Sequence, residues 1–423
     1  MSVNVRDRSW LLVGFIALIG LGLLSSCVEV AKPYDQIPPG IWRAELALTK
    51  DAKLPFNLES SYDDDGKLNI HILNAEERIK VEEISFGTTK MLKDTIVIGF
   101  PLLDTYITAE YRENVIEGVW HVNNREDYEI PFVAYHGQSH RFTTDITDPA
   151  ADLTGKWAAT FELETEDEYP AIGEFVQKGN NLSGTFLTET GDYRYLEGTV
   201  QGDKFSLSCF DGSHAFLFEG TISEQEVLAG SFLSGNHYET NWIAKRDEDA
   251  ALTDVYGLSQ ITTPDKKIHF SLPNSEGQTI SLTDSQYEGK AKLITIMGTW
   301  CPNCLDESKF IIDYLEKKPK EDLAVIALAF EKYRDKTTAI SKIKNYKDRL
   351  SIPYEILMAG YYDKAEATKE LGFIDEILSY PTLLFVNKEN EVIKVHTGFN
   401  GPATSEYAAF QSSFDKLVNE ITQ

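Results

Sequence analysis

Short runs of alternating hydrophobic and polar residues fill the chain from about Gly40 to about Arg246, and Gly, Asn and Asp separate the runs. This alternation is typical of antiparallel β-strands, because neighbouring side chains of a strand point to opposite faces of the sheet. About eight candidate strands can be marked in each half of this region. The pattern therefore predicts an all-β region.

The two halves of the β region are similar to each other. The segments GIWRAELAL from Gly40 and GKWAATFEL from Gly155 both begin with glycine, one further residue, tryptophan and an alternating run. The later segments VIEGVWHV and VLAGSFLS fall at comparable places. We therefore expect two repeated antiparallel units, barrel-like or sandwich-like, over residues 27–150 and 151–250. The opening glycine–tryptophan pattern resembles that of lipocalin-like barrels.

The hydrophobic period changes beyond the charged stretch RDEDAALTD, residues 246–254, which is typical of a linker. Candidate strands and candidate helices then alternate, and this alternation predicts an α/β domain with a central sheet over residues 257–423. The candidate strands are two in KIHFSLPNSEGQTISLTD and one each in AKLITIMG, LAVIALAF, TLLFV and EVIKVHT. The candidate helices are CLDESKFIIDYLEKK, TTAISKIKNYKDRL, DKAEATKEL and a segment from about Ser405.

The N-terminal segment has the form of a secretory signal. Two arginines precede an apolar run from Trp10 to Leu24, which is too short for a comfortable membrane span. The run closes on LSSC, which resembles a bacterial lipobox. This resemblance implies a lipoprotein signal peptide over residues 1–26 and a lipid on Cys27 that attaches the protein to a membrane. The alternative is an ordinary signal peptide with an incidental cysteine.

Export and charge limit the possible partners. We expect the protein in the bacterial cell envelope, facing the periplasm, where disulfides persist. The chain has 423 residues and a formal net charge of -27, so it lacks the basic footprint that DNA or RNA binding needs. We expect no nucleic-acid partner, and we interpret the acidic excess as a solvated surface.

Three cysteines follow Cys27, namely Cys209, Cys301 and Cys304. A zinc site would need four ligands, and no second pair at ligand spacing follows the CPNC segment. A structural disulfide across two intervening residues closes a very small loop and contributes little stability. We therefore expect no metal and no cofactor. Cys209, alone in the alternating segment KFSLSCF, is expected to be a buried free thiol.

The two close cysteines stand in GTWCPNC, residues 298–304, where a strand gives way to a helix. Far downstream, Tyr380-Pro381-Thr382 precedes the strand LLFV. This arrangement resembles the thioredoxin fold. More narrowly, it is similar to the TlpA/ResA-type membrane-anchored thiol-disulfide oxidoreductases, which share the approach FSLPNSEGQTISLTD, the frame of the motif and a glutamate three residues past the second cysteine, here Glu307.

The chemistry of the pair follows from its place at a helix start. Unpaired backbone N–H groups and the positive end of the helix dipole favour a thiolate on Cys301, which makes it the nucleophile. Cys304, one turn into the helix, is placed to resolve the mixed disulfide. The resemblance implies that Pro381 is cis and lies against the pair, and that Trp300, Tyr380 and Pro381 contact the substrate.

Two positions depart from thioredoxin itself. Thioredoxin carries a buried aspartate on the strand before the motif, and the matching residue here is Thr295. The resemblance to the ResA branch gives the proton-transfer role to Glu307, although a glutamate near a helix start is also a common surface residue. The second departure is Tyr380, which replaces the usual threonine or valine before the proline.

Two functional hypotheses result from the sequence. The first is a lipid-anchored enzyme that reduces disulfides in exported proteins and is recharged by a membrane electron donor of the thiol-disulfide type. The second is a lipoprotein whose β region captures a ligand or glycan, with the thioredoxin-like domain as a scaffold. A thiol peroxidase is disfavoured, because Ile294 and Gly298 stand where such enzymes place a proline and a threonine.

Overall fold

The structure, a computed structural model, describes residues 37–91 and 93–423. The predicted signal segment 1–26 and the predicted lipid site Cys27 lie outside these residues. Within the described part, no helix is both long and apolar enough to cross a membrane. Residues Pro38–Gln423 form one compact unit.

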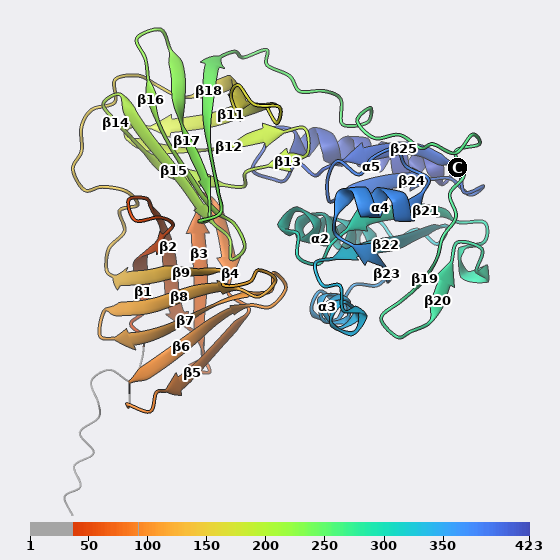
Figure 1. Cartoon of the computed structure of the whole chain (residues 1–423), viewed down its shortest axis with the longest axis horizontal. Coiled ribbons are helices and arrows are strands. Elements are labelled where there is room, and N and C mark those ends of the chain that lie inside the picture. The colour runs from red at the N-terminus through yellow and green to blue at the C-terminus, as the bar shows by residue number, and fades with distance from the viewer. Residues whose placement is uncertain (1–36, 92) are drawn as a thin grey trace, which may run out of the picture. The chain divides into compact units, whose positions relative to one another are not determined.

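The first nine strands form one antiparallel sheet in the order β4-β3-β2-β1-β9-β8-β7-β6-β5 (Figure 1, red to orange). They are β1 (Gly40–Ala47), β2 (Lys53–Tyr62), β3 (Leu68–Asn74), β4 (Glu77–Lys80), β5 (Glu83–Thr88), β6 (Asp94–Phe100), β7 (Thr105–Arg112), β8 (Val115–Val122) and β9 (Glu129–His136). Strands β4 and β5 are its two edges, so the sheet is a half-barrel that stays open.

The next nine strands form a second antiparallel sheet, and this one closes. They are β10 (Gly155–Phe161), β11 (Tyr169–Lys178), β12 (Asn181–Thr188), β13 (Gly191–Asp192), β14 (Leu196–Gln201), β15 (Lys204–Phe210), β16 (Ala215–Ile222), β17 (Val227–Ser234) and β18 (Tyr238–Arg246). Pairing of β11 with β12 completes a ring of eight strands, while β13 is a short addition to β12. The prediction of two repeated β units is confirmed, and one of them is a true barrel.

The repeated tryptophans occupy equivalent places in the two units. Trp42 in β1 and Trp157 in β10 are both buried. The indole N–H of Trp42 donates to Ser60 Oγ at 3.0 Å, and that of Trp157 donates to the Leu153 carbonyl at 2.9 Å. Each ring therefore fills the core at the start of its unit and leaves no unpaired polar group.

The second pair of repeated segments, VIEGVWHV and VLAGSFLS, shares a glycine for a physical reason. Gly118 in β8 and Gly230 in β17 each face the backbone of a paired strand. A Cβ at Gly118 would lie 1.9 Å from the Thr108 carbonyl oxygen, and one at Gly230 would lie 2.0 Å from that of Glu219. Only glycine permits these close approaches, which explains why both segments carry it at the same place.

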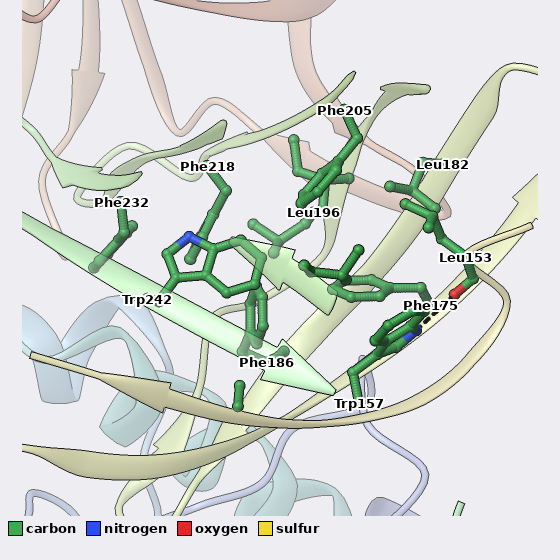
Figure 2. Close-up of a cluster of buried hydrophobic side chains, with 14 of the residues drawn as sticks. Leu153, Trp157, Phe175, Leu182, Phe186, Leu196, Phe205, Phe218, Phe232 and Trp242 are labelled. Atoms are coloured by element: carbon green, nitrogen blue, oxygen red, sulfur yellow. Dashed lines mark hydrogen bonds between the residues drawn. The ribbon is translucent and has the colours of Figure 1, made fainter. Parts of the chain in front are cut away.

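Aromatic side chains fill the interior of the second unit, as Figure 2 shows. The rings of Phe186 and Phe218 stack with centroids 4.9 Å apart, and those of Phe218 and Phe232 stack at 4.4 Å. Trp242 packs into the same cluster. Eight strands enclose just enough room for side chains, so this barrel is a packed core. Cys209 is fully buried in the same cluster as a free thiol, as predicted.

The C-terminal region is an α/β domain. Its five-stranded sheet has the order β23-β22-β21-β24-β25 and is flanked by helices (Figure 1, teal to blue). Its strands are β21 (Ala291–Met297), β22 (Leu323–Glu331), β23 (Glu355–Tyr361), β24 (Thr382–Val386) and β25 (Val392–Thr397). Strands β21, β22 and β23 are parallel, and β24 runs antiparallel to β21 and to β25.

The remaining elements of the C-terminal domain are a hairpin, a 3-10 turn and four helices. The hairpin β19 (Ser271–Pro273) and β20 (Thr279–Ser281) precedes the sheet, and the 3-10 turn η1 is Ser285–Tyr287. The helices are α2 (Pro302–Lys317), α3 (Lys336–Arg349), α4 (Lys364–Leu371) and α5 (Tyr407–Ile421). All four helices were predicted. The edge strand β23 was not, although its apolar stretch ILMA could have indicated it.

Candidate active site

Cys301 lies in the turn between the end of the central strand β21 and the start of α2. Gly298 makes the intervening turn possible, because a Cβ there would lie 2.3 Å from Trp300 Nε1 and 2.8 Å from the Phe330 carbonyl oxygen. The backbone N–H of Cys301 donates to the Gly298 carbonyl at 3.2 Å. Cys301 is the N-cap of α2, and Pro302 takes the first helical position, which suits a residue without an N–H.

The Cys301 sulfur has two polar neighbours. It accepts a hydrogen bond from the backbone N–H of Cys304 at 3.2 Å, and as a thiol it donates to the Tyr380 carbonyl at 3.4 Å. Backbone N–H groups at a helix start stabilise a thiolate, so the first contact favours the nucleophilic form. Both Cys301 and Cys304 are free thiols, and Cys301 is 5% exposed.

The loop before β24 packs against the pair. The peptide bond between Tyr380 and Pro381 is cis, which confirms the expectation for this proline. The Tyr380 ring is buried and meets the Trp300 ring edge-on, with centroids 5.7 Å apart. Trp300 is fixed in turn by a hydrogen bond from its Nε1 to the Phe330 carbonyl at 2.9 Å. The three predicted substrate-contact residues therefore gather beside Cys301.

Cys304 is the more buried of the two cysteines, at 1% exposed. Burial raises the pKa of its thiol well above the usual range, and the neighbouring Cys301 raises that pKa further. The ionised form is therefore unfavourable in the resting protein. Any reaction that uses the Cys304 thiolate needs a nearby group to take its proton.

Glu307 is buried in the core of the domain, 1% exposed, and is not a surface residue. Its Oε2 accepts a hydrogen bond from Thr295 Oγ1 at 2.5 Å, and no described residue gives its Oε1 a hydrogen-bond partner. Burial raises the pKa of Glu307 to about 8, against the lowering effect of Thr295. Thr295 stands where thioredoxin has its buried aspartate. Here that position holds a threonine, which donates a hydrogen bond to the carboxyl of Glu307 on α2.

Sequence reasoning missed a second buried carboxyl. Glu331, at the end of β22, is 1% exposed and accepts hydrogen bonds from the Thr299 N–H at 3.0 Å and its hydroxyl at 2.8 Å. Burial raises the pKa of Glu331 to about 7. The following Lys332 places its Nζ 4.3 Å from the centre of the Trp300 ring. Acidic and basic residues directly after the apolar run LAVIALAF were the available signal.

Replacing Glu307 with glutamine should change how stability depends on pH. The pKa of Glu307 is about 8 in the folded chain against an ordinary 4.5, so its contribution is present below pH 4.5 and is lost as pH rises towards 8. At 1.36 kcal/mol per pKa unit, the loss is about 3 kcal/mol by pH 7. The unfolding free energy of Glu307→Gln relative to wild type should therefore rise by about that amount between pH 4.5 and pH 7.

Urea unfolding at these two pH values measures the effect. The matched control is Glu316→Gln, at an exposed position of the same helix. Parallel pH profiles for wild type and Glu307→Gln would contradict the buried, protonated state of Glu307.

Comparisons with known proteins agree with this geometry. The family model Redoxin matches residues 262–410. The thiol-disulfide oxidoreductase ResA of Halalkalibacterium halodurans is 25% identical over 136 residues, which are 32% of this chain and 68% of that protein.

Three solved structures are similar to part of the chain. A thiol:disulfide interchange protein of Chlorobium tepidum TLS is 21% identical, with a TM-score of 0.28, and covers 39% of this chain and 100% of its own. The C-terminal domain of a thiol-disulfide oxidoreductase of Bacteroides thetaiotaomicron is 15% identical, with a TM-score of 0.29, and covers 38% and 98%. StoA of Bacillus subtilis is 18% identical, with a TM-score of 0.25, and covers 32% and 92%.

The dithiol at a helix start and the cis proline beside it lie inside the matched segment. Residues 262–410 therefore form a Redoxin domain of the thioredoxin-like thiol-disulfide oxidoreductase type.

Proposed function

We propose that the CPNC dithiol reduces disulfides in exported proteins. The Cys301 thiolate attacks one sulfur of the client disulfide, so that a Cys301–client disulfide forms and the other client sulfur leaves as a thiolate. The Cys304 thiolate then attacks the Cys301 sulfur. This step forms the Cys301–Cys304 disulfide and releases the second client sulfur, so two electrons pass to the client. A membrane electron donor of the thiol-disulfide type returns the pair to the dithiol.

The observation that carries this proposal is the different surroundings of the two sulfurs. The Cys301 sulfur faces a backbone N–H at a helix start, which suits a nucleophile. Cys304 is almost fully buried, which suits a thiol that acts only on its neighbour. Such a division of roles is what attack followed by resolution requires.

Glu307 serves as the proton acceptor for Cys304 in this scheme. It lies three residues further along α2, and residues i and i+3 share a face of a helix. Its Oε1, free of hydrogen bonds from the described residues, is the atom that takes the proton. Thr295 holds the other oxygen and keeps the carboxyl oriented.

Trp300, Tyr380 and Pro381 form the client-contact surface. The Tyr380 carbonyl already lies 3.4 Å from the Cys301 sulfur, so backbone groups of this loop can reach a peptide bound at the sulfur. The Tyr380 ring itself is turned into the core, where its hydroxyl donates to the Tyr362 carbonyl at 3.1 Å. The tyrosine thus supports the loop from behind and leaves backbone groups for the client.

Insulin reduction tests the proposal. The chain without its signal segment, supplied with dithiothreitol, should precipitate insulin chains faster than dithiothreitol alone. A rate equal to that of dithiothreitol alone would contradict the proposed activity. The alternative of a ligand- or glycan-binding lipoprotein gains no support from the barrel, whose interior is filled with aromatic side chains.

Lipid on Cys27 is the proposed membrane attachment, and it rests on the LSSC segment. We expect Cys27→Ala to leave the protein soluble or unprocessed, because the acylated residue is absent. Cell fractionation and immunoblotting measure this, with Cys209→Ser as the matched control. A correctly cleaved Cys27→Ala chain that stays in the membrane fraction would rule out lipidation.

A further inference from the structure

A hairpin of the barrel reaches the cis-proline loop. Residues 188–192, the hairpin that joins β12 to β13, are here called the barrel hairpin. The Thr190 carbonyl accepts a hydrogen bond at 2.9 Å from the hydroxyl of Ser379, a buried residue two positions before Pro381. The Thr190 backbone also lies so close to Gly398 that a Cβ there would be 2.7 Å away.

The same hairpin touches the CPNC turn. Gly191 is buried, and a Cβ at this position would lie 2.4 Å from the side-chain nitrogen of Asn303. Asn303 stands between the two cysteines. Consecutive residues of the barrel hairpin therefore contact the two loops that flank the Cys301 sulfur, the CPNC turn and the cis-proline loop.

Polar contacts anchor the hairpin on both sides of this point. The Asp192 carboxylate accepts a hydrogen bond at 2.6 Å from the backbone N–H of Gly401. Arg194, which follows the hairpin, forms ion pairs with Asp306 on α2 and with Glu77 at 2.8 Å. Asp306 is only two residues past Cys304, so the ion pair between Arg194 and Asp306 lies close to the dithiol.

We propose that the barrel hairpin is a built-in cover that occupies the client groove. Its backbone already occupies the loops beside the Cys301 sulfur: the Ser379 hydroxyl donates to the Thr190 carbonyl, and Gly191 lies against Asn303. With the hairpin in place Cys301 is 5% exposed. A client disulfide reaches the sulfur only when the hairpin moves off, so client binding and hairpin release compete. This inference rests on the proposed reductase function for its biological meaning.

The physical consequence is an equilibrium between a covered and an open dithiol. A few hydrogen bonds and one ion-pair group hold the cover, so a client with enough contact surface can displace it. A substitution that weakens only the covered state raises the open fraction, and the reactivity of Cys301 rises by the same factor.

Alkylation of Cys301 by iodoacetamide measures the open fraction without any client. The measurement uses chains that carry Cys27→Ala and Cys304→Ser, so the remaining thiols are Cys301 and Cys209, and Cys209 is fully buried. Rates are taken across pH. The plateau at high pH reports access to the thiolate, whereas the midpoint reports its ionisation.

Gly191→Val should raise the plateau rate at least about tenfold, because the backbone φ of +149 is strained for valine and the added side chain must displace that of Asn303. Asp192→Ala, which removes the acceptor for Gly401, should raise it several-fold. The matched control is Gly179→Val, at a left-handed glycine in the β11–β12 turn with no neighbour within 4 Å. Its plateau should equal that of the unsubstituted hairpin.

Circular dichroism establishes that each variant is folded. Equal plateaus for all four chains would overturn the cover, and so would an equal rise in Gly179→Val, which would indicate general loosening of the barrel. Insulin reduction separates the two proposals. A Gly191→Val chain with Cys304 intact that fails to reduce insulin, although the same substitution raises the plateau, contradicts the reductase function and leaves the cover standing.

Discussion

Replacing Cys301 with serine should lower insulin reduction to the level of dithiothreitol alone, because the thiolate is the nucleophile. A serine hydroxyl does not ionise near neutral pH and cannot form the mixed disulfide. The structure supports this role through the helix start that faces the sulfur and the Cys304 N–H that donates to it at 3.2 Å. Initial rates of insulin precipitation give the comparison.

Cys209→Ser is the matched control for this loss. Cys209 is a free thiol in the packed interior of the barrel and has no access to solvent. Its replacement should leave the rate unchanged. Full activity in Cys301→Ser, or loss of activity in Cys209→Ser with the fold intact, would show that Cys301 is not the reacting sulfur.

Glu307→Gln should slow resolution of the mixed disulfide by at least about tenfold near pH 7. Burial raises the pKa of Cys304, so its thiol needs a base at the moment of attack. The pKa of Glu307 is about 8, so most of its carboxyl is protonated at pH 7 and the active fraction grows with pH. The wild-type rate should therefore rise up to about pH 8 and then level off, and glutamine should remove this inflection.

Thr295→Val separates base catalysis from mere support of the fold. The Thr295 hydrogen bond lowers the pKa of Glu307, so its loss should move the inflection to higher pH without removing it. Stopped-flow decay of a preformed mixed disulfide measures the profiles, with Glu316→Gln as the exposed control on the same helix. Superimposable profiles for wild type and Glu307→Gln would deny Glu307 any part in proton transfer.

The ionisation of Glu307 also affects the Cys304 thiol. A carboxylate near Cys304 opposes its ionisation, and the structure gives Glu307 this effect on the pKa of Cys304. With a Glu307 pKa of about 8, the carboxylate is the minor form at pH 7. Above pH 8 the carboxylate is the major form, and it opposes ionisation of Cys304 there. Substitution of Glu307 by glutamine removes this charge and should therefore lower the pKa of Cys304.

Local patterns predicted much of the site. The apolar strand AKLITIM, the small turn at Gly298 and the helical spacing after Cys301 placed the dithiol at a helix start, where the structure has it. The burial of Glu307 was harder to predict, because a glutamate near a helix start is usually exposed. It is buried here because Thr295 on the adjacent strand offers its carboxyl a hydrogen bond.

Contacts between distant segments could not be predicted. Glu331 reaches Thr299 only because β22 lies beside β21, and Gly191 meets Asn303 across more than a hundred residues of sequence. Closure of the sheets depends on the same kind of contact. The strand pattern is alike in both halves, yet β4 and β5 remain edges while β12 pairs with both β11 and β14.

Mapping a trapped mixed disulfide tests the central claim most directly. The reduced Cys304→Ser chain is mixed with a peptide that contains one disulfide, quenched in acid, digested without reductant and analysed by mass spectrometry. Loss of the resolving thiol should leave the peptide joined to Cys301 as the accumulated species. A Cys301–peptide adduct is the predicted result. An adduct on Cys209 instead, or no adduct when wild type reduces the same peptide, would contradict the assignment of Cys301 as nucleophile.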